Sequence, residues 1–197
     1  MNSLPHKKQL RALLRHRRNV LSFSERSNAS QAVCNKIEII PSLFETSQNL
    51  AFYRAHDGEV NIDNALKKAQ AIGKNCYLPV LHSSQNHLDF YSFHLEDLLI
   101  KNHFGIEEPD ISQEKPISVV KLDLIFLPLV AFDKKGNRLG RGAGHYDRAL
   151  APLKNKTLKK PVLVGIAYEF QKIDETPFEK WDVPLNFVIT EKTIYRF

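Results

Sequence analysis

The sequence predicts an α/β protein, a three-layer α/β/α sandwich with a mostly parallel sheet. Segments typical of strands alternate with segments of helical spacing, an order that favours parallel strands joined by helical crossovers. Residues 124–132 and 161–168 are almost continuously apolar, as strands buried on both faces are. We therefore expect residues 1–197 to form one domain.

The first two segments have helical spacing. Ser3 and Pro5 predict a helix over residues 4–21, with a stripe of leucines (10, 13, 14 and 21) beside a basic stripe of Lys7, Lys8, Arg11, Arg15 and Arg18. A second helix begins at Ser22, where Glu25 completes a capping box, and continues to about residue 40, because Pro41 interrupts it.

The next segments predict a β-α-β unit. Residues 49–55 form its first strand, 56–58 a turn, 61–72 a helix closed by Gly73, and 75–81 the second strand. Residues 88–93 alternate in strand fashion and predict an edge hairpin with the preceding strand. Residues 96–104 predict a short helix at best. The acidic, proline-containing segment 105–116 predicts a surface loop.

The second half of the chain contains a glycine-rich loop. A polar turn over residues 133–137 follows the strand at 124–132, and then come Gly140, Gly142 and Gly144 with Arg138 and Arg141. A helix is expected over 147–153, a basic linker over 154–160, and strands over 161–168 and 187–191. Glycines let backbone N–H groups approach an anion, and guanidinium groups add charge-assisted hydrogen bonds. The loop therefore predicts a phosphate site, although this spacing alone also fits a mobile turn.

Composition narrows the class of protein. Hydrophobic residues make up 43% of the chain and charged residues 25%, as in ordinary globular proteins. No run of eighteen apolar residues exists, and the N-terminus lacks the apolar core of a signal peptide, so we expect a cytoplasmic protein. Cys34 and Cys76 have no metal-ligand spacing and are expected to be buried free thiols.

The net charge of +6 requires an anionic partner or a solvated basic face. Nucleic acid and small polyanions would both account for it. No RNA-binding aromatic signature, helix-turn-helix pattern or zinc finger accompanies the charge. The charge alone does not choose between these partners.

Three segments together resemble one family. FDKKGNRLGRGAGHYD at residues 132–147 resembles the signature F-D-x-x-G-x-R-L-G-x-G-x-G-x-Y-D of the 5-formyltetrahydrofolate cyclo-ligase family, also called 5,10-methenyltetrahydrofolate synthetase. KKQLR at residues 7–11 resembles its K-x-x-L-R segment, and residues 181–191 resemble its closing D-x-P and T-E segment. His145, Leu129 and Trp181 depart from the Tyr, Gly and His that are usual there.

The resemblance implies ATP- and Mg²⁺-dependent cyclisation of 5-formyltetrahydrofolate through a phosphorylated formyl group. It also implies a fold related to the sugar-phosphate isomerase and coenzyme A transferase group. The residues that it implicates in ATP binding are Lys7, Arg11, Arg138, Leu139, Gly140, Arg141, Gly142, Ala143, Gly144, His145 and Tyr146. Arg138 and Arg141 are expected to be catalytic. Arg54, Glu59, Arg141, His145 and Tyr146 are expected to bind the folate, and Asp147 and Asp182 to bind Mg²⁺.

Two other functions are open at this point. A phosphosugar or acyl-CoA enzyme of the same fold group would bind phosphate without consuming ATP, but it would not need Asp147 and Asp182. A nucleic-acid-binding module would use the basic first helix, but aromatic residues are not interleaved with its charges. We expect ATP and a folate, polyglutamylated, as small-molecule partners of a monomer, with no nucleic acid and no membrane.

Overall fold

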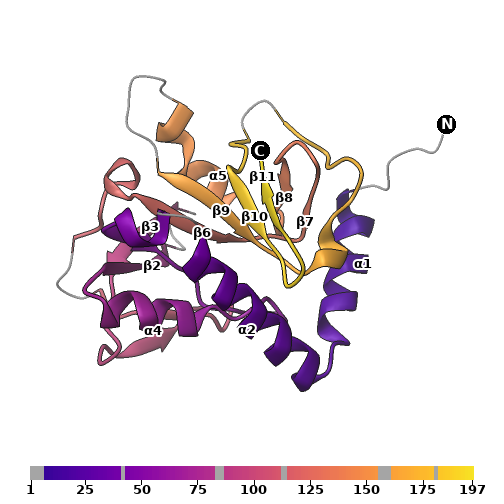
Figure 1. The fold of residues 1–197 in the computed structure, drawn as a ribbon. Helices are drawn as coiled ribbons and strands as arrows, with labels where there is room; N and C mark the ends of the chain where they lie inside the picture. Colours follow the sequence, from indigo (N-terminus) through magenta and orange to yellow (C-terminus); the bar gives the residue numbers. More distant parts are fainter. Residues whose placement is uncertain (1–6, 41–42, 83–86, 112–114, 155–160, 180–181) are drawn as a thin grey trace.

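The predicted α/β fold with a mostly parallel sheet is confirmed (Figure 1). The computed structural model describes residues 7–40, 43–82, 87–111, 115–154, 161–179 and 182–197. Its main sheet has seven strands in the order β11-β10-β9-β6-β1-β2-β3. The strands are β1 Asn49–Ala51, β2 Asn75–His82, β3 His87–Ser92, β6 Leu124–Pro128, β9 Val162–Ile166, β10 Phe187–Ile189 and β11 Ile194–Arg196. The inner strands are parallel, and β3 and β11 pair antiparallel at the two edges.

The helices and two small sheets surround this main sheet. The helices are α1 Lys7–Asn19, α2 Phe23–Ile39, α3 Leu43–Thr46, α4 Asp63–Ala71 and α5 His145–Ala149, with 3₁₀ turns η1 Val119–Lys121, η2 Ala151–Lys154 and η3 Glu169–Gln171. One hairpin joins β4 Leu99–Lys101 to β5 Glu107–Pro109, and another joins β7 Ala131–Phe132 to β8 Arg138–Leu139. Among the described residues, no helix has the length and apolar character needed to span a bilayer.

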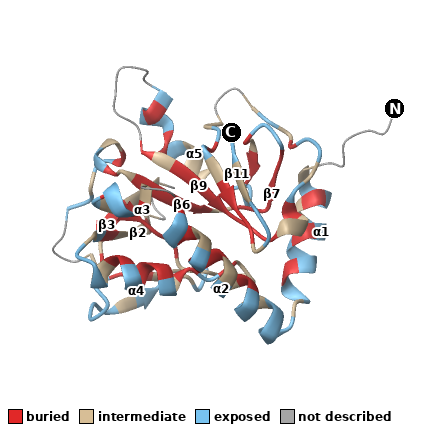
Figure 2. Ribbon diagram, viewed as in Figure 1, coloured by how far each residue is buried: buried red, intermediate tan, exposed pale blue. Residues whose placement is uncertain are grey.

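Two apolar clusters bury the two faces of the main sheet. Figure 2 shows its inner strands β6 and β9 coloured as buried. Leu124 and Phe126 of β6 pack in the cluster that includes residues of α2 and α4. Ile125 and Leu127, which point the other way, pack in the cluster that includes Ala149 of α5. Burial on both faces explains why the sequence of this strand is continuously apolar.

The first helix packs on the β7–β8 hairpin. Leu10 and Leu14 of α1 form a third cluster with Val130, Ala131 and Leu139. Figure 1 shows α1 beside β7, at the edge of the molecule. The predicted apolar stripe of residues 4–21 is confirmed over α1 at these two leucines, whereas Leu13 is 58% exposed. The predicted cap at Ser3 lies outside the described residues.

Several predicted elements need correction in the middle of the chain. Residues 96–104 do not form a helix, because Asn102 Oδ1 accepts the backbone N–H of Phe104 and of Ile106 and so favours a turn. The predicted loop 105–116 contains β5. The predicted strand 124–132 divides after Pro128, since the carbonyls of Leu129 and Val130 accept hydrogen bonds from Gln171 rather than from a strand.

Element ends also differ from the prediction. The first strand ends at Ala51 instead of residue 55, and the rest of that segment continues toward the cleft. The helix expected over 147–153 begins at His145 and gives way to the 3₁₀ turn η2. The last predicted strand, 187–191, ends at Ile189, because Thr190 and Thr193 form a turn that leads into the unpredicted β11. Ser22 and Glu25 form the predicted capping box of α2.

Candidate active site

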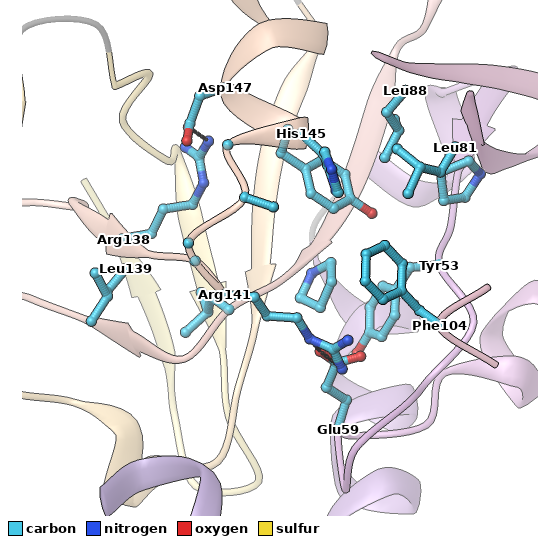
Figure 3. A pocket seen from close by; sticks show the side chains of 18 of the residues that line it. Tyr53, Glu59, Leu81, Leu88, Phe104, Arg138, Leu139, Arg141, His145 and Asp147 are labelled. Carbon is cyan, nitrogen blue, oxygen red and sulfur yellow. Dashed lines mark hydrogen bonds and ion pairs between the residues drawn. The ribbon is translucent and has the colours of Figure 1, made fainter. Parts of the chain in front are cut away.

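One cleft of about 520 Å³ brings together every site residue that the sequence predicted. It lies beyond the carboxyl end of β1 and β6, the edge where open α/β sheets bind ligands. Its lining includes Lys7, Arg11, Arg54, Glu59, the whole of residues 138–147, and Asp182. Figure 3 shows Arg138 with Asp147 on one side of this cleft, and Tyr53, Leu81, Leu88 and Phe104 on the other.

The glycine loop over residues 140–144 is held against the first helix. Arg11 Nε donates to the carbonyl oxygen of Gly140 at 2.8 Å. Gly142 has φ +111°, and a Cβ there would lie 3.2 Å from Arg11 Cζ, so a larger residue would be strained and crowded. The loop follows β8 rather than a strand of the main sheet, which corrects the expected strand, loop and helix order. Because α5 has five residues, we assign no anion site to its N-terminus.

Three of the predicted phosphate-binding cations are paired with a carboxylate, whereas Arg11 contacts the carbonyl oxygen of Gly140. Lys7 Nζ lies 2.7 Å from Glu179 Oε1, and Arg141 Nη2 lies 3.0 Å from Glu59 Oε1. The buried Arg138 Nη2 lies 2.5 Å from Asp147 Oδ1, and its Nη1 donates to the carbonyl oxygen of Val183. Burial lowers the pKa of Arg138, and the charge of Asp147 opposes that shift. An anion that enters the cleft therefore meets cations that already form ion pairs with carboxylates of the protein.

A network of charges underlies the turn at residues 56–59. Arg18, 1% exposed, lies 2.8 Å from Asp57 Oδ2 and 3.8 Å from Glu59 Oε1. Burial raises the pKa of Glu59, and the charges of Arg141 and Arg18 oppose it. Burial would also raise the pKa of Asp57, but hydrogen bonds from Arg15 and Asn19 and the charge of Arg18 lower it to about 2. The turn thus links α1 to Arg141 of the glycine loop.

The two predicted metal ligands are hard oxygen donors at the cationic end. Asp147 and Asp182 both line the cleft, and the charges of both act on Arg138. Asp182 Oδ2 accepts the backbone N–H of Glu179 at 2.9 Å. The described residues contain no group of three or more side chains arranged for a metal ion. Mg²⁺ in phosphate-transfer sites uses one or two carboxylates with water and phosphate oxygens, so this donor pair fits that ion.

The opposite end of the cleft is apolar. Tyr53, Leu81, Leu88, Phe104 and Ile106 contribute to its wall. Tyr146 adds a phenol whose pKa is raised by burial, and the ring of His145 lies 6.3 Å from that of Phe104. Burial also lowers the pKa of His145. This wall suits a flat heterocycle.

Arg54 reaches the cleft from the segment after β1. It pairs with Asp63 Oδ1 at 2.8 Å and with Glu107 Oε2 at 2.7 Å, so it links α4 to the β4–β5 hairpin. Cys34 and Cys76 are buried free thiols, as predicted. Trp181, which departs from the family pattern, lies outside the described residues.

Sequence reasoning missed the hairpin that closes one side of the cleft. Phe104, Ile106 and Glu108 lie in a segment that was predicted as a helix end and a loop. Arg18 was assigned only to a basic stripe, and Glu179 was not singled out. Asn102 and Gly105 at turn spacing were a signal for the hairpin. No local pattern indicates that Arg18 is buried.

Comparisons with known proteins identify one family. The model of the 5-formyltetrahydrofolate cyclo-ligase family matches residues 3–191. A 5-formyltetrahydrofolate cyclo-ligase of Haemophilus influenzae is 38% identical over 91% of this chain and 94% of its own. One of Escherichia coli is 32% identical over 94% of this chain and 100% of its own. The solved structure of the Aquifex aeolicus 5,10-methenyltetrahydrofolate synthetase has a TM-score of 0.81 and 34% identity, covering 96% of this chain and 92% of that one.

Proposed function

The chain belongs to the 5-formyltetrahydrofolate cyclo-ligase family, and we propose that the cleft described above is where it carries out that reaction. The enzyme converts 5-formyltetrahydrofolate to 5,10-methenyltetrahydrofolate, and membership of the family implies that it uses ATP. This assignment selects the cyclo-ligase over the phosphosugar, acyl-CoA and nucleic-acid-binding functions considered from the sequence.

The reaction must convert the formyl oxygen into a leaving group. In our proposal the formyl oxygen attacks the γ-phosphorus of ATP. The bond between this phosphorus and ADP breaks, and an N5 iminophosphate forms. N10 of the folate then attacks the formyl carbon and loses its proton, the carbon–oxygen bond breaks, and the phosphate that leaves with that oxygen can accept the proton. N10 is the nucleophile, so no side chain is needed to generate one. The protein mainly positions the two substrates and stabilises phosphoryl charge.

The cationic end of the cleft has the groups for this task. We assign phosphate contacts to the backbone of residues 139–144 and charge stabilisation of the transferred phosphoryl group to Arg138 and Arg141. Lys7 and Arg11 would bind the nucleotide from α1, and His145 and Tyr146 border it. Because Lys7 and Arg141 are paired with Glu179 and Glu59, phosphate oxygens would replace or share existing carboxylate contacts.

Asp147 and Asp182 would hold Mg²⁺ beside the phosphates. When bound, this ion neutralises charge on the phosphate oxygens. Asp147 would then exchange part of its contact with Arg138 for the ion. Arg138 would be freer to contact the phosphoryl group.

The apolar end would receive the folate. Its wall of Tyr53, Leu81, Leu88 and Phe104 suits a pteridine ring, and we assign folate contacts to Arg54, Glu59, Arg141, His145 and Tyr146. His145 offers an imidazole where the family usually has a phenol. The two substrates would meet near Arg141, which lines the cleft beside Glu59.

The observation that carries this proposal is that residues far apart in sequence, from Lys7 to Asp182, line one cleft. The test is to mix the protein with 5-formyltetrahydrofolate, ATP and Mg²⁺ and to follow methenyl absorbance in the near ultraviolet together with ADP release. We expect one ADP for each methenyl group formed. Omission of ATP should abolish the signal, and product formation without ATP would contradict the proposed mechanism.

Further parts of the proposal rest on the sequence. We propose a three-layer arrangement related to the sugar-phosphate isomerase and coenzyme A transferase group, formed by a single domain over residues 1–197. We also propose that the enzyme acts as a cytoplasmic monomer on polyglutamylated folates. Sedimentation of the purified protein tests the oligomeric state.

A further inference from the structure

Glu108 is a buried carboxylate in the cleft with no assigned role. It lies in β5, at 7% exposure, on the hairpin that also contributes Phe104 and Ile106 to the apolar wall. Asn102 shapes this hairpin loop, because its Oδ1 accepts the N–H groups of Phe104 and Ile106 at 2.9 and 3.1 Å. The position of Glu108 is therefore set by backbone pairing and a capped turn.

One oxygen of Glu108 is anchored. Its Oε1 accepts the backbone N–H of Leu81 at 3.0 Å and the side-chain amide of Asn102 at 2.6 Å. Strand β2 continues to His82, whereas its neighbour β1 ends at Ala51, opposite Tyr77. The Leu81 N–H lies beyond the residues of β2 that pair with β1. Glu108 accepts this N–H where β1 provides no backbone carbonyl.

The other oxygen is open. Both hydrogen bonds to the Glu108 side chain within the described residues go to Oε1, so Oε2 has no partner there. In the same part of the chain, every side-chain oxygen that is fully buried does have a partner. Oε2 is therefore accessible, in a residue that lines the cleft. A carboxylate anchored through one oxygen with the other open is preorganised to accept hydrogen bonds from a ligand.

The other glutamates of this part of the cleft are more engaged. Glu59 uses Oε1 for Arg141 and Oε2 for the backbone N–H of His56, at 3.1 Å in each case. Glu107 accepts from Arg54 and its side chain is 41% exposed. Both of these carboxylates have an arginine as partner, whereas the hydrogen bonds to Glu108 come from neutral donors only. Glu108 is thus the glutamate of these three that can accept hydrogen bonds from uncharged N–H groups on one edge of a ligand.

We propose that Glu108 is a specificity-determining residue that accepts hydrogen bonds from the 2-amino group and N3–H of the folate pteridine. These two donors lie side by side on one edge of the ring, and a carboxylate is their complement. The inference rests on the proposed binding of the folate at the apolar end of the cleft. It assigns the recognition of the ring edge to Glu108, whereas Glu59 and Arg141 act nearer the formyl group.

The central test is Glu108→Gln. The amide oxygen can still accept from Leu81 and Asn102, but an NH₂ group replaces Oε2 and opposes the ligand's donors. We expect the KM for 5-formyltetrahydrofolate to rise about 10- to 100-fold, the effect of losing hydrogen bonds to a charged group. The KM for ATP should stay within about twofold. Glu38→Gln makes the same chemical change on an exposed face of α2 and is the matched control.

A substrate analogue separates contact from structure. Parent enzyme should bind 2-desamino-5-formyltetrahydrofolate about 10-fold or more weakly than the natural substrate. Glu108→Gln should bind the two about equally, because the contact that distinguishes them is gone. Equal binding by the parent enzyme would overturn the inference, and that measurement needs no variant to fold. The inference would also be overturned if parent and Glu108→Gln lost affinity for the analogue, relative to the natural substrate, by the same factor.

Failure of the Glu108 inference can be distinguished from failure of the proposed function. If Arg141→Ala impairs turnover while Glu108→Gln behaves as the parent, the role of Glu108 is wrong and the cleft assignment stands. If both variants turn over as the parent does, the cleft assignment is wrong as well. Near-ultraviolet circular dichroism of each variant verifies that the fold is retained.

Discussion

Two buried glutamates of the same cleft are held in opposite ways. Glu59, in the turn at residues 56–59, faces the guanidinium groups of Arg141 and Arg18. Glu108, in the β4–β5 hairpin, accepts from a backbone N–H and the amide of Asn102. Burial raises the pKa of both; the charges of Arg141 and Arg18 oppose the shift most at Glu59, whereas at Glu108 the hydrogen bonds from Asn102 and Leu81 oppose it more than nearby histidine charge does.

This difference shows that ion pairs stabilise the turn at residues 56–59, whereas backbone hydrogen bonds stabilise the β4–β5 hairpin. The turn depends on ion pairs from α1 and the glycine loop, so loss of one cation reduces the compensation of its buried carboxylate partners. The hairpin depends on strand pairing and a capped loop, which change little with charge. Substitutions in the turn should therefore affect stability and phosphate chemistry, and those in the hairpin should affect folate binding.

The largest expected effect comes from Arg18→Leu. Removal of this buried guanidinium leaves Asp57 with the partly exposed Arg15, and Glu59 with Arg141, as its nearest cation, and should lower the free energy of unfolding by about 3 to 5 kcal/mol. Urea denaturation measures it. Arg15→Leu is the matched control, since Arg15 reaches the same Asp57 Oδ2, at 2.6 Å, from a side chain that is 46% exposed. It should cost about 1 kcal/mol or less. Equal losses of unfolding free energy in the two variants would show that the buried and the partly exposed arginine contribute alike.

Arg141→Ala tests the guanidinium of the glycine loop that pairs with Glu59 of the turn. We expect kcat/KM to fall about 30- to 1000-fold, equivalent to about 2 to 4 kcal/mol of transition-state stabilisation. The assay is the rate of methenyl absorbance. Arg196→Ala, on the exposed end of β11, should leave the rate unchanged. Parent-like turnover by Arg141→Ala would show that the guanidinium does not act on the phosphoryl group.

The pH dependence of Asp57 sharpens the comparison further. Its pKa is about 2 in the folded protein and 3.8 ordinarily, so its stabilisation is present above pH 4 and is lost as the pH falls toward 2. Asp57→Asn should lower the free energy of unfolding by about 2 kcal/mol near pH 6, and the gap should close by about pH 2. Asn tolerates the φ of 55° at this position. A gap independent of pH would contradict a charge effect.

Phe104→Ala tests the hairpin and should have the smallest effect. We expect the KM for 5-formyltetrahydrofolate to rise about 5- to 20-fold, because the ring contributes about 1 to 2 kcal/mol of apolar contact. Stability should change little, since Phe104 is 49% exposed. Phe178, 48% exposed and outside the cleft lining, provides the control. An equal change in the KM for ATP would contradict the division of the cleft.

The sequence was sufficient for local features that one segment encodes by itself. The capping box at Ser22, the edge hairpin of β2 and β3, and the doubly buried strand β6 each follow from short-range pattern. The glycine loop and the segments resembling a known family indicated the site residues. Glu96 to Phe104 was mispredicted, because a side-chain turn at Asn102 outweighed a weak helical pattern.

The tertiary structure decided what depends on partners distant in sequence. Arg18 and Arg15 look alike on a helical stripe, yet docking of the turn at Asp57 buries one and leaves the other partly exposed. Glu107 and Glu108 are adjacent, and only their packing gives one an arginine and the other a strand end. Burial and partner identity set the charge and function of a polar group, and both arise when segments far apart in the chain meet.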